Sequence, residues 1–408
     1  MKYAVLVGDG MADWKIKDLG HRTPLECAAT PNMDKVASQG EIGLVRTVPE
    51  GFPPGSDVAN LSIMGYDPRR YYTGRSPLEA ASMGVELEEG DVAFRCNLVT
   101  LSDGGPYEEK IMVDYSADEI TSAESRPLIE EVNRRLGTKE LVFYPGFGFR
   151  HLLVWKNGSR EVALTPPHDI PGRVIGGHLP AGKGADVLVR LMKESSAFLP
   201  EHPVNRERQK KGLRPANSIW FWGHGVKPSM ESFFKKYGLK GAVISAVDLI
   251  KGIGSCAGLE VIRVEGVTGT LTTNYRGKVE AALGALAAGA DFVYVHAEAP
   301  DAASHRGELE NKIRAIEMVD EMLGLLLSGL KKLGAHRVLV LPDHPTPLAI
   351  MTHSDEPVPF AACTFDPSKN ESLPGGPKVK FCEDGARQSG LFVAEGHRLM
   401  DCFINGKF

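Results

Sequence analysis

The stretches DFVYVHAEAPD (residues 291–301) and HRVLVLPDHP (residues 336–345) frame the part of the sequence that decides the fold. Each contains a continuous run of apolar and β-branched residues, which is typical of a strand buried on both faces. Between them, residues 308–334 carry apolar side chains at helical spacing and end at a glycine. A strand, a helix and a second strand in this order predict a parallel βαβ unit.

The same pattern occurs in two other places. YAVLVGDG (residues 3–10) predicts a buried strand near the N-terminus, and NYRGKVEAALGALAAG (residues 274–289) predicts a helix just before the strand at 291–301. We therefore expect an α/β protein with a mostly parallel sheet that helices cover on both faces.

The middle of the chain has a different character. It contains shorter strand patterns (residues 92–101 and 141–155) and isolated helical patterns (near residues 116–136 and 185–198). Two domains are also the natural expectation for 408 residues. We expect a smaller α+β domain, residues 91–214, inserted into a domain that is built from residues 1–90 and 215–408.

Composition narrows the classes of function. Hydrophobic residues make up 42% and charged residues 24% of the chain, as in an ordinary globular protein. A net charge of −5 gives no general attraction to nucleic acid or to an anionic membrane. No apolar run reaches the ~18 residues of a membrane helix. The apolar run in the start MKYAVLVGDGMADW is too short for a signal peptide. The six cysteines form no CxxC pair, so we expect reduced thiols and a cytoplasmic location.

Acidic residues and histidines follow three of the predicted strands. Because the carboxyl ends of parallel strands meet at one edge of a sheet, we expect these side chains to lie close together. Carboxylates and imidazoles suit Zn or Mn better than calcium, with Mg and Co as further candidates. Six ligands exceed the needs of one ion, so we expect two divalent metal ions. The six residues are Asp9, Asp301, His305, Asp343, His344 and His353.

Each of these residues has an ordinary structural interpretation when it is taken alone. A single aspartate after a strand is most often a turn former or a helix cap, and a single histidine is usually structural or exposed. The metal-site hypothesis rests on the coincidence of four segments.

Ser56 lies at a break between two patterns. PPGS (residues 53–56) is a turn, and DVANLSIMG (residues 57–65) continues as a helix. At a helix N-terminus, unpaired N–H groups and the helix dipole favour an anion such as phosphate. A metal bound to the serine hydroxyl would make it a nucleophile. The alternative for this segment alone is a helix-capping serine.

Longer motifs carry a resemblance to a known family. The chain resembles the cofactor-independent phosphoglycerate mutases of archaeal type, which belong to the alkaline-phosphatase superfamily. The likeness extends over most of the chain and implies an alkaline-phosphatase-like fold. The motifs are HRTPLECAATPNMD (residues 21–34), PPGSDVANLSIMGYDP (53–68), YYTGRSPLEAASMG (71–84), DVAFRCNLVTL (91–101), YGLKGAVISAVDLIKGIG (237–254) and VTGTLTTNY (267–275).

The resemblance implies an isomerase of glycolysis and gluconeogenesis. Ser56 would take the phosphoryl group from one glycerate oxygen and return it to the other, so that 3- and 2-phosphoglycerate interconvert without 2,3-bisphosphoglycerate. Matching motif positions imply one metal held by Asp301, His305 and His353. They imply a second metal held by Asp9, Ser56, Asp343 and His344.

A phosphoglycerate needs cations that bind its charged groups and a group that moves protons. The resemblance and these needs select six residues, and for each arginine the ordinary alternative is a surface cation. The candidates for catalysis beside Ser56 are Lys251 and His168, and those for substrate binding are Arg75, Arg150, Asp169 and Arg214.

Other functions remain open at this point. Asn60 stands where the mutases usually have a histidine, and His151 and DHPTP (residues 343–347) resemble a sister branch proposed to be homoserine kinases. GHLPAGKG (residues 177–184) nearly spells a phosphate-binding P-loop, but Gly184 replaces the required Ser or Thr, so we expect a glycine-rich turn. A metal-dependent phosphatase is a third possibility. A non-catalytic metal-binding protein is disfavoured because it would have no use for Ser56.

Overall fold

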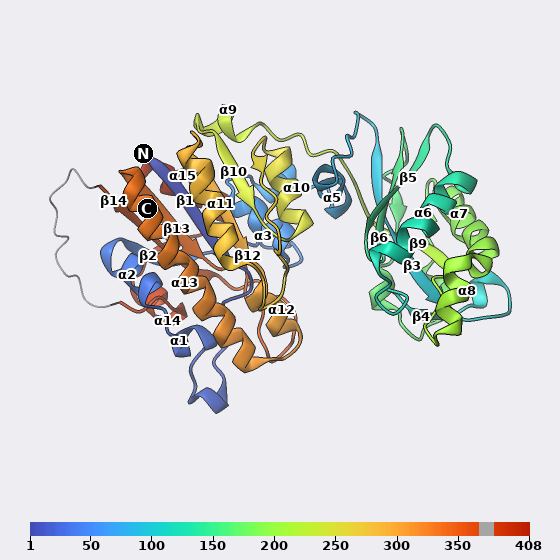
Figure 1. Ribbon diagram of the computed structural model, residues 1–408, viewed down its shortest axis with the longest axis horizontal. Helices are drawn as coiled ribbons and strands as arrows, with labels where there is room; N and C mark the ends of the chain where they lie inside the picture. The colour runs from blue at the N-terminus through green and yellow to red at the C-terminus, as the bar shows by residue number, and fades with distance from the viewer. Residues whose placement is uncertain (367–378) are drawn as a thin grey trace. The chain divides into compact units, whose positions relative to one another are not determined.

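The computed structural model describes residues 1–366 and 379–408 (Figure 1). These residues form two compact units. Unit 1 consists of Met1–Tyr72 and Ser229–Phe408, and unit 2 consists of Thr73–Pro228. The sequence predicted an inserted domain of residues 91–214. The observed unit 2 is longer at both ends.

Unit 1 is built on an eight-stranded sheet. Neighbouring strands are parallel except at β14, which is antiparallel to both of its neighbours. The expectation of a mostly parallel sheet is confirmed. In spatial order the strands are β11 (Glu260–Val261), β10 (Gly241–Ile244), β12 (Phe292–Ala297), β1 (Lys2–Gly8), β13 (His336–Leu341), β14 (Val358–Phe365), β2 (Glu41–Val45) and β15 (Phe392–Val393).

Both faces of this sheet are buried, which explains the unbroken apolar runs in its strands. On β1, Ala4 and Leu6 belong to the core that contains α2 (Pro31–Gln39), α11 (Tyr275–Ala287) and α13 (Leu309–Leu333). Val5 and Val7 are equally buried and point to the opposite face. That face is covered by α3 (Ser56–Ile63), α10 (Asp248–Cys256) and α15 (Leu399–Asn405).

The long helix between the two framing strands ends where the sequence predicts. Residues 308–334 were expected to be helical, and α13 occupies Leu309–Leu333. Its buried apolar residues, which include Val319, Leu323, Leu326 and Leu330, recur at helical spacing. Gly334 follows with a φ of 99°, a conformation that favours glycine, and ends the helix.

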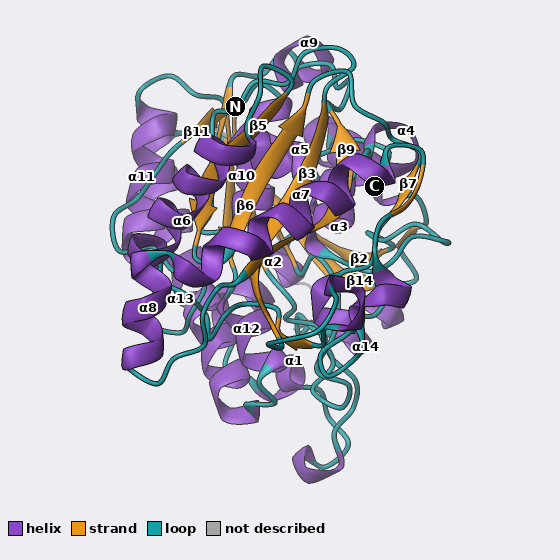
Figure 2. Cartoon of the chain, turned by 90° about the vertical axis from the view of Figure 1, so that its right-hand side faces the viewer, coloured by secondary structure: helices purple, strands orange, loops and turns teal. Residues whose placement is uncertain are grey.

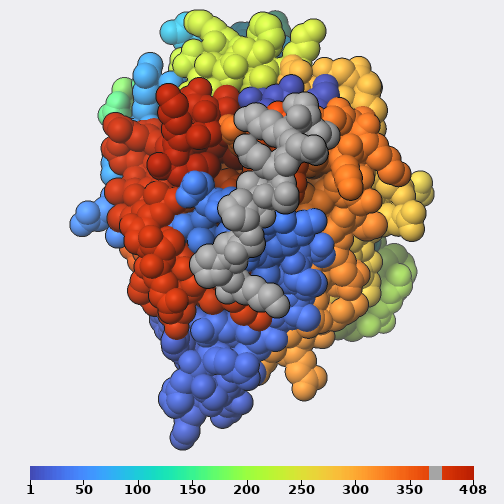
Figure 3. Space-filling model, turned by 90° about the vertical axis from the view of Figure 1, so that its left-hand side faces the viewer, coloured from blue at the N-terminus to red at the C-terminus, as the bar shows by residue number. Residues whose placement is uncertain are grey.

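Shorter elements complete unit 1. On the face in Figure 3, N-terminal residues (blue) lie beside C-terminal residues (red), in agreement with the position of β2 between β14 and β15. The shorter helices among the described residues are α1 (Pro24–Cys27), α4 (Pro68–Tyr71), α9 (Phe233–Tyr237), α12 (Ala299–His305), α14 (Glu383–Gln388), η1 (Lys17–Leu19) and η6 (Gly396–Arg398).

Unit 2 is an α+β structure around the fully buried strand β3 (Val92–Leu101). β3 pairs antiparallel with β6 (Arg150–Trp155) on one side and with β9 (Ser218–Val226) on the other. β5 (Leu141–Phe147) extends the sheet beyond β6, and β4 (Met112–Asp114) pairs with the end of β3.

Helices cover the two faces of the β3 sheet. The helices α6 (Ser122–Leu136) and α7 (Ala185–Phe198) lie on one face (Figure 2). On the other face, α5 (Arg75–Ser82) packs against β3 and β9. These contacts and the pairing of β9 with β3 explain why residues 73–90 and 215–228 belong to unit 2.

The segment that resembles a P-loop, residues 177–184, is a turn only at its end, residues 183–184, directly before α7. Ala181–Gly182 forms β8, which pairs antiparallel with β7 (Val162–Ala163), and Gly184, with a φ of 85°, precedes α7. Across the described residues, none of the helices has the length and apolar character needed to span a membrane. The other short helices of unit 2 are α8 (Pro203–Lys210), η2 (Tyr107–Glu109), η3 (Pro167–Asp169), η4 (Ile175–His178) and η5 (Leu199–Glu201).

Candidate metal and nucleophile site

Three buried aspartates lie after three neighbouring strands. β12, β1 and β13 are adjacent in the sheet. Asp9 directly follows β1, Asp301 lies on α12 just after β12, and Asp343 follows β13. The structure thus brings the predicted carboxylates to one edge of the sheet, as the parallel topology requires.

The first group of potential ligands contains Asp301, His344 and His353, whose ligand atoms all lie within 4.8 Å of one another. His305 extends this group, since its Nε2 lies 3.2 Å from Asp301 Oδ2 and 3.0 Å from His353 Nε2. Burial would raise the pKa of Asp301, but hydrogen bonds from His305 and His353 hold it well below its usual value. All the residues predicted for the first metal are therefore close enough to hold one ion.

The second group contains Asp9, His296 and Asp343, again within 4.8 Å of one another and all buried. His296 Nε2 lies 3.4 Å from Asp9 Oδ2 and 3.9 Å from Asp343 Oδ2. His344, which was predicted for this metal, lies beside both groups, since its Nε2 is 3.6 Å from Asp9 Oδ1. His296 was not among the ligands predicted from the sequence. The signal was an imidazole inside an otherwise apolar strand.

The charges in the second group fit a divalent cation. Asp9 Oδ1 and His296 Nε2 are buried and have no hydrogen-bond partner, although burying such groups is costly. Burial and the charge of Asp343 raise the pKa of Asp9 well above its usual value. For Asp343, burial is outweighed by His344 and His296, and the pKa is lowered. A cation would satisfy both unpartnered atoms and balance the two carboxylates.

Backbone donors fix the carboxylate of Asp343. The N–H groups of Gly10 and His344 donate to Asp343 Oδ1 over 3.1 and 2.9 Å. Gly10 has a φ of 62°, and a Cβ there would lie only 2.9 Å from the Cα of Asp301. Only glycine therefore allows this close approach of the chain behind Asp9.

Asn60 links the metal-ligand edge to the helix that carries Ser56. Its Nδ2 donates to Asp343 Oδ2 and to the Ser56 carbonyl, each over 2.8 Å. The Tyr294 hydroxyl donates to Asn60 Oδ1 over 2.5 Å. A buried amide with its polar atoms engaged in this way is rigid. Asn60 thus fixes the Asp343 carboxylate relative to the start of α3.

Ser56 is the first residue of α3, and Gly55 precedes it in the N-cap position. The prediction of a serine at a helix start is confirmed. Its Oγ lies 3.0 Å from His344 Nε2, so the hydroxyl is at the edge of the acid and imidazole groups. The Val58 N–H donates to Asp57 Oδ1 over 3.0 Å. The positive end of the helix dipole favours an anion such as phosphate beside the serine.

Lys251 lies on α10, which packs against α3. Its Nζ is 2.6 Å from Asp248 Oδ1, and only 13% of its side chain is exposed. The predicted catalytic lysine therefore lies on the helix that packs against the helix of Ser56. It is paired with an aspartate one turn earlier on its own helix.

Lys312 ties together two of the loops that carry ligands. Its fully buried Nζ donates to Asp13 Oδ2 over 2.7 Å, to the Ala12 carbonyl over 3.3 Å and to the Thr346 carbonyl over 2.9 Å. Thr346 in turn donates to Asp301 Oδ1 over 2.6 Å. The segments after β1 and β13 are thus fastened to α13.

We expect Lys312→Met to lower the free energy of unfolding by about 3–5 kcal/mol, because it leaves the Asp13 carboxylate buried without its cation. Urea unfolding followed by circular dichroism measures this. Lys331→Met, on the exposed side of the same helix, should change stability by less than about 0.5 kcal/mol. Adding Asp13→Leu to Lys312→Met should recover much of the lost stability. If Lys312→Met and Lys331→Met were equally stable, the proposed role of Lys312 would be contradicted.

The predicted substrate-binding residues lie in unit 2. The His168 ring lies 5.0 Å from the Trp222 ring, and the Arg95 guanidinium lies over the Trp222 ring, 4.5 Å from its centre. The same guanidinium is paired with Glu79, with 2.8 Å between Nε and Oε2. Burial lowers the pKa of His168, and the charges of Arg95, Arg75 and Arg150 lower it further. These residues form a cationic cluster within unit 2. Arg95 was missed, although an arginine inside a buried strand pattern is a signal.

The remaining candidates differ in their surroundings. Asp169 lies beside His168, with 3.7 Å between Oδ1 and Nε2. Arg214 Nη1 is bound by Asp114 Oδ2 at 2.8 Å and by Asp118 Oδ1 at 3.1 Å. Two carboxylates therefore compensate the charge of Arg214, as Glu79 compensates that of Arg95.

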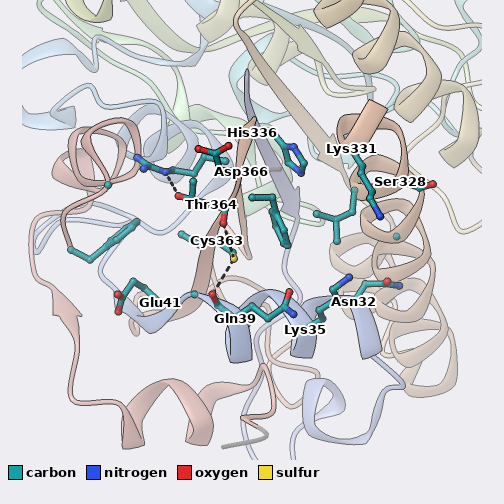
Figure 4. Close-up of a pocket in the computed structure, with 18 residues that line it drawn as sticks. Asn32, Lys35, Gln39, Glu41, Ser328, Lys331, His336, Cys363, Thr364 and Asp366 are labelled. Atoms are coloured by element: carbon teal, nitrogen blue, oxygen red, sulfur yellow. Dashed lines mark hydrogen bonds between the residues drawn. The ribbon is translucent and has the colours of Figure 1, made fainter. Parts of the chain in front are cut away.

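A pocket of about 820 Å³ lies elsewhere in unit 1 (Figure 4). Its lining includes His336 at the start of β13 and Thr364 near the end of the antiparallel β14. This is the amino end of β13, opposite to the end that leads to Asp343. The pocket is therefore separate from the acid and imidazole groups.

Fold and side chains together define the class: an α/β enzyme with grouped potential metal ligands at the carboxyl edge of its sheet. Residues 37–205 match the family model of 2,3-bisphosphoglycerate-independent phosphoglycerate mutase. The chain belongs to this family, because it matches curated members over nearly its full length. The expected relationship is confirmed.

Two relatives illustrate the similarity. A probable 2,3-bisphosphoglycerate-independent phosphoglycerate mutase of Geobacter sulfurreducens is 55% identical, over 99% of this chain and 100% of that protein. The mutase of Methanothrix thermoacetophila is 53% identical, over 100% of both chains.

Solved structures agree. A protein from Pyrococcus horikoshii has a TM-score of 0.81 and 30% identity, over 99% of this chain and 96% of that chain. The cofactor-independent phosphoglycerate mutase from Thermoplasma acidophilum has a TM-score of 0.66 and 27% identity, over 100% of both chains.

Proposed function

We propose that the protein interconverts 3-phosphoglycerate and 2-phosphoglycerate through a phosphoserine at Ser56, without 2,3-bisphosphoglycerate. The observation that carries the proposal is the position of Ser56 Oγ at the start of α3, 3.0 Å from His344 Nε2. The names of relatives that match the whole chain support the substrate. Activity in the cytoplasm, in glycolysis and gluconeogenesis, follows from this reaction.

Two divalent cations, Mn or Zn, belong to the proposal. Asp301, His305 and His353 would hold one, and Asp9, Asp343, His344 and Ser56 would hold the other. When bound, the cations supply positive charge that polarises the phosphoryl oxygens and favours the serine alkoxide.

The residues of the chain then act in two transfers. In the first, Ser56 Oγ forms a bond to phosphorus, the bond from phosphorus to one glycerate oxygen breaks, and the serine proton replaces phosphorus on that oxygen. In the second, the other glycerate oxygen forms a bond to phosphorus, the bond from phosphorus to Ser56 Oγ breaks, and the proton of that glycerate hydroxyl returns to Ser56 Oγ. The positive end of the α3 dipole favours the phosphoryl oxygens beside Ser56, and Lys251 adds positive charge beside α3.

In unit 2, the cationic cluster is suited to bind the glycerate carboxylate. Arg75 and Arg150 are the candidates to pair with a carboxylate, since Arg95 is paired with Glu79. His168 is kept neutral at physiological pH because its pKa is lowered. A neutral imidazole can accept or donate a proton at a glycerate hydroxyl. We assign these roles to the cluster, with Asp169 as the partner of His168.

The homoserine kinase alternative needs a nucleotide site, and the segment that most resembles one, residues 177–184, does not have the conformation of a P-loop. A P-loop places a glycine-rich turn between a strand and a helix so that its N–H groups surround phosphates. Residues 177–184 instead contain the strand β8, whose backbone pairs with β7. This conformation favours the mutase over the kinase.

A three-way assay on metal-loaded protein tests the function. We expect 2-phosphoglycerate to form from 3-phosphoglycerate, detected with enolase, in the absence of ATP and bisphosphoglycerate. ADP release with homoserine and ATP, without mutase activity, would replace the proposal with the kinase. Release of inorganic phosphate as the main product would replace it with a phosphatase.

A further inference from the structure

His296 is a buried imidazole that the roles assigned so far do not use. It lies on β12, is 0% exposed and directs Nε2 toward Asp9 and Asp343. This Nε2 atom has no hydrogen-bond partner. Buried polar atoms of this kind are rare without a bound group.

The other ring nitrogen indicates which form the imidazole takes. His296 Nδ1 lies 3.3 Å from the Oγ of Ser245, the residue that follows β10. Ser245 Oγ also accepts the Val247 N–H over 2.9 Å. Donation from Nδ1–H to this hydroxyl leaves the Nε2 lone pair facing two carboxylates. Metal-binding histidines commonly have this arrangement, in which an outer partner fixes the tautomer.

The distance to Asp9 also fits one shared ion, and the distance to Asp343 is slightly longer. Two ligand atoms that each lie about 2.1 Å from one ion are roughly 3.0–3.5 Å apart when they occupy neighbouring positions. His296 Nε2 is 3.4 Å from Asp9 Oδ2, and it is 3.9 Å from Asp343 Oδ2. Both separations exceed a normal hydrogen bond to a carboxylate, and small shifts of the side chains would bring all three atoms onto a cation.

We propose that His296 is a direct ligand of the cation at the Asp9–Asp343 position. The inference rests on the proposed two-metal function and adds to it an imidazole from β12 that the motif comparison did not include. The additional nitrogen ligand favours Zn or Mn over Mg at this position.

A crystal structure of the zinc-loaded protein, with anomalous scattering at the zinc edge, tests the contact directly. We expect His296 Nε2 at about 2.0–2.1 Å from one zinc ion. A structure with two bound zinc ions and His296 Nε2 more than about 3 Å from both would overturn the proposal.

Zinc affinity provides a second test. We expect His296→Gln to weaken one of two zinc sites by at least about 10-fold, since loss of an outer partner alone typically costs 10- to 100-fold. His336→Gln is the matched control, because His336 is also buried in this sheet but lies at the amino end of β13. It should leave both affinities unchanged. Ser245→Ala, which retains the imidazole, should weaken the same site, which keeps the test usable if His296→Gln does not fold.

The outcomes separate this inference from the proposed function. Unchanged zinc affinities in His296→Gln, with two ions bound and mutase activity in the parent protein, would show that His296 only balances charge. A parent protein that binds no zinc or manganese would overturn both proposals.

Discussion

Replacing Ser56 by alanine is expected to lower the rate of phosphoglycerate interconversion by about 10³-fold or more. The substitution removes the oxygen that would accept the phosphoryl group, and the other binding residues cannot replace a covalent nucleophile. Because Ser56 is half-buried at the start of α3 and Gly55 occupies the N-cap position, we expect the fold to persist. The coupled enolase assay and circular dichroism measure the two properties.

Ser62→Ala provides a control on the same helix. Ser62 is buried in α3, and its Oγ has no hydrogen-bond partner in the structure. Removing this hydroxyl should therefore leave both activity and stability close to those of the parent protein. Mass spectrometry after rapid quenching should detect a phosphate on Ser56 in the parent protein and in Ser62→Ala. A Ser56→Ala protein with near-normal turnover would show that Ser56 is not the nucleophile.

The sequence predicted the parts of the fold that local patterns determine. Continuous apolar runs identified β1, β12 and β13 because both faces of these strands are buried. Since parallel strands share one carboxyl edge, the positions of Asp9, Asp301 and Asp343 followed from the strand predictions. The end of α13 at Gly334 followed from the need for a positive φ.

Features that depend on tertiary contacts were harder to predict. The division near residue 90 was misplaced because α5 has no local signal that shows which sheet it packs against, and it packs against β3 and β9. Likewise, β9 joins unit 2 through long-range pairing with β3.

Polar residues inside strands were missed for a related reason. His296 and Arg95 lie within apolar patterns, and only the folded structure shows that their partners are Asp9 and Trp222. Asn60 was recognised as unusual, but its contacts with Asp343 and Tyr294 come from segments more than two hundred residues away.

Removal of divalent cations by a chelator is expected to abolish the interconversion and to lower the melting temperature. Without cations, the carboxylates of Asp9, Asp301 and Asp343 remain buried close together, and Asp9 Oδ1 has no partner. A cation that binds only the folded state stabilises it by about 2.7 kcal/mol at a concentration of 100 times Kd. Activity assays and thermal unfolding, before and after treatment with chelator and re-addition of Mn or Zn, measure both effects.

Two aspartate variants decide whether these effects come from the proposed site. Asp343→Asn should lose activity, and its melting temperature should respond less to re-added metal, because the amide supplies a weaker ligand. If the amide oxygen keeps the bonds from Gly10 and His344, its NH2 group faces the Nδ2 donor of Asn60. Asp320→Asn removes a buried carboxylate that instead binds the N–H groups of Asn32 and Met33. This variant should be less stable than the parent protein but should keep the full response to metal. Full activity in excess chelator, or an equal response of both variants, would contradict a catalytic metal site at this edge of the sheet.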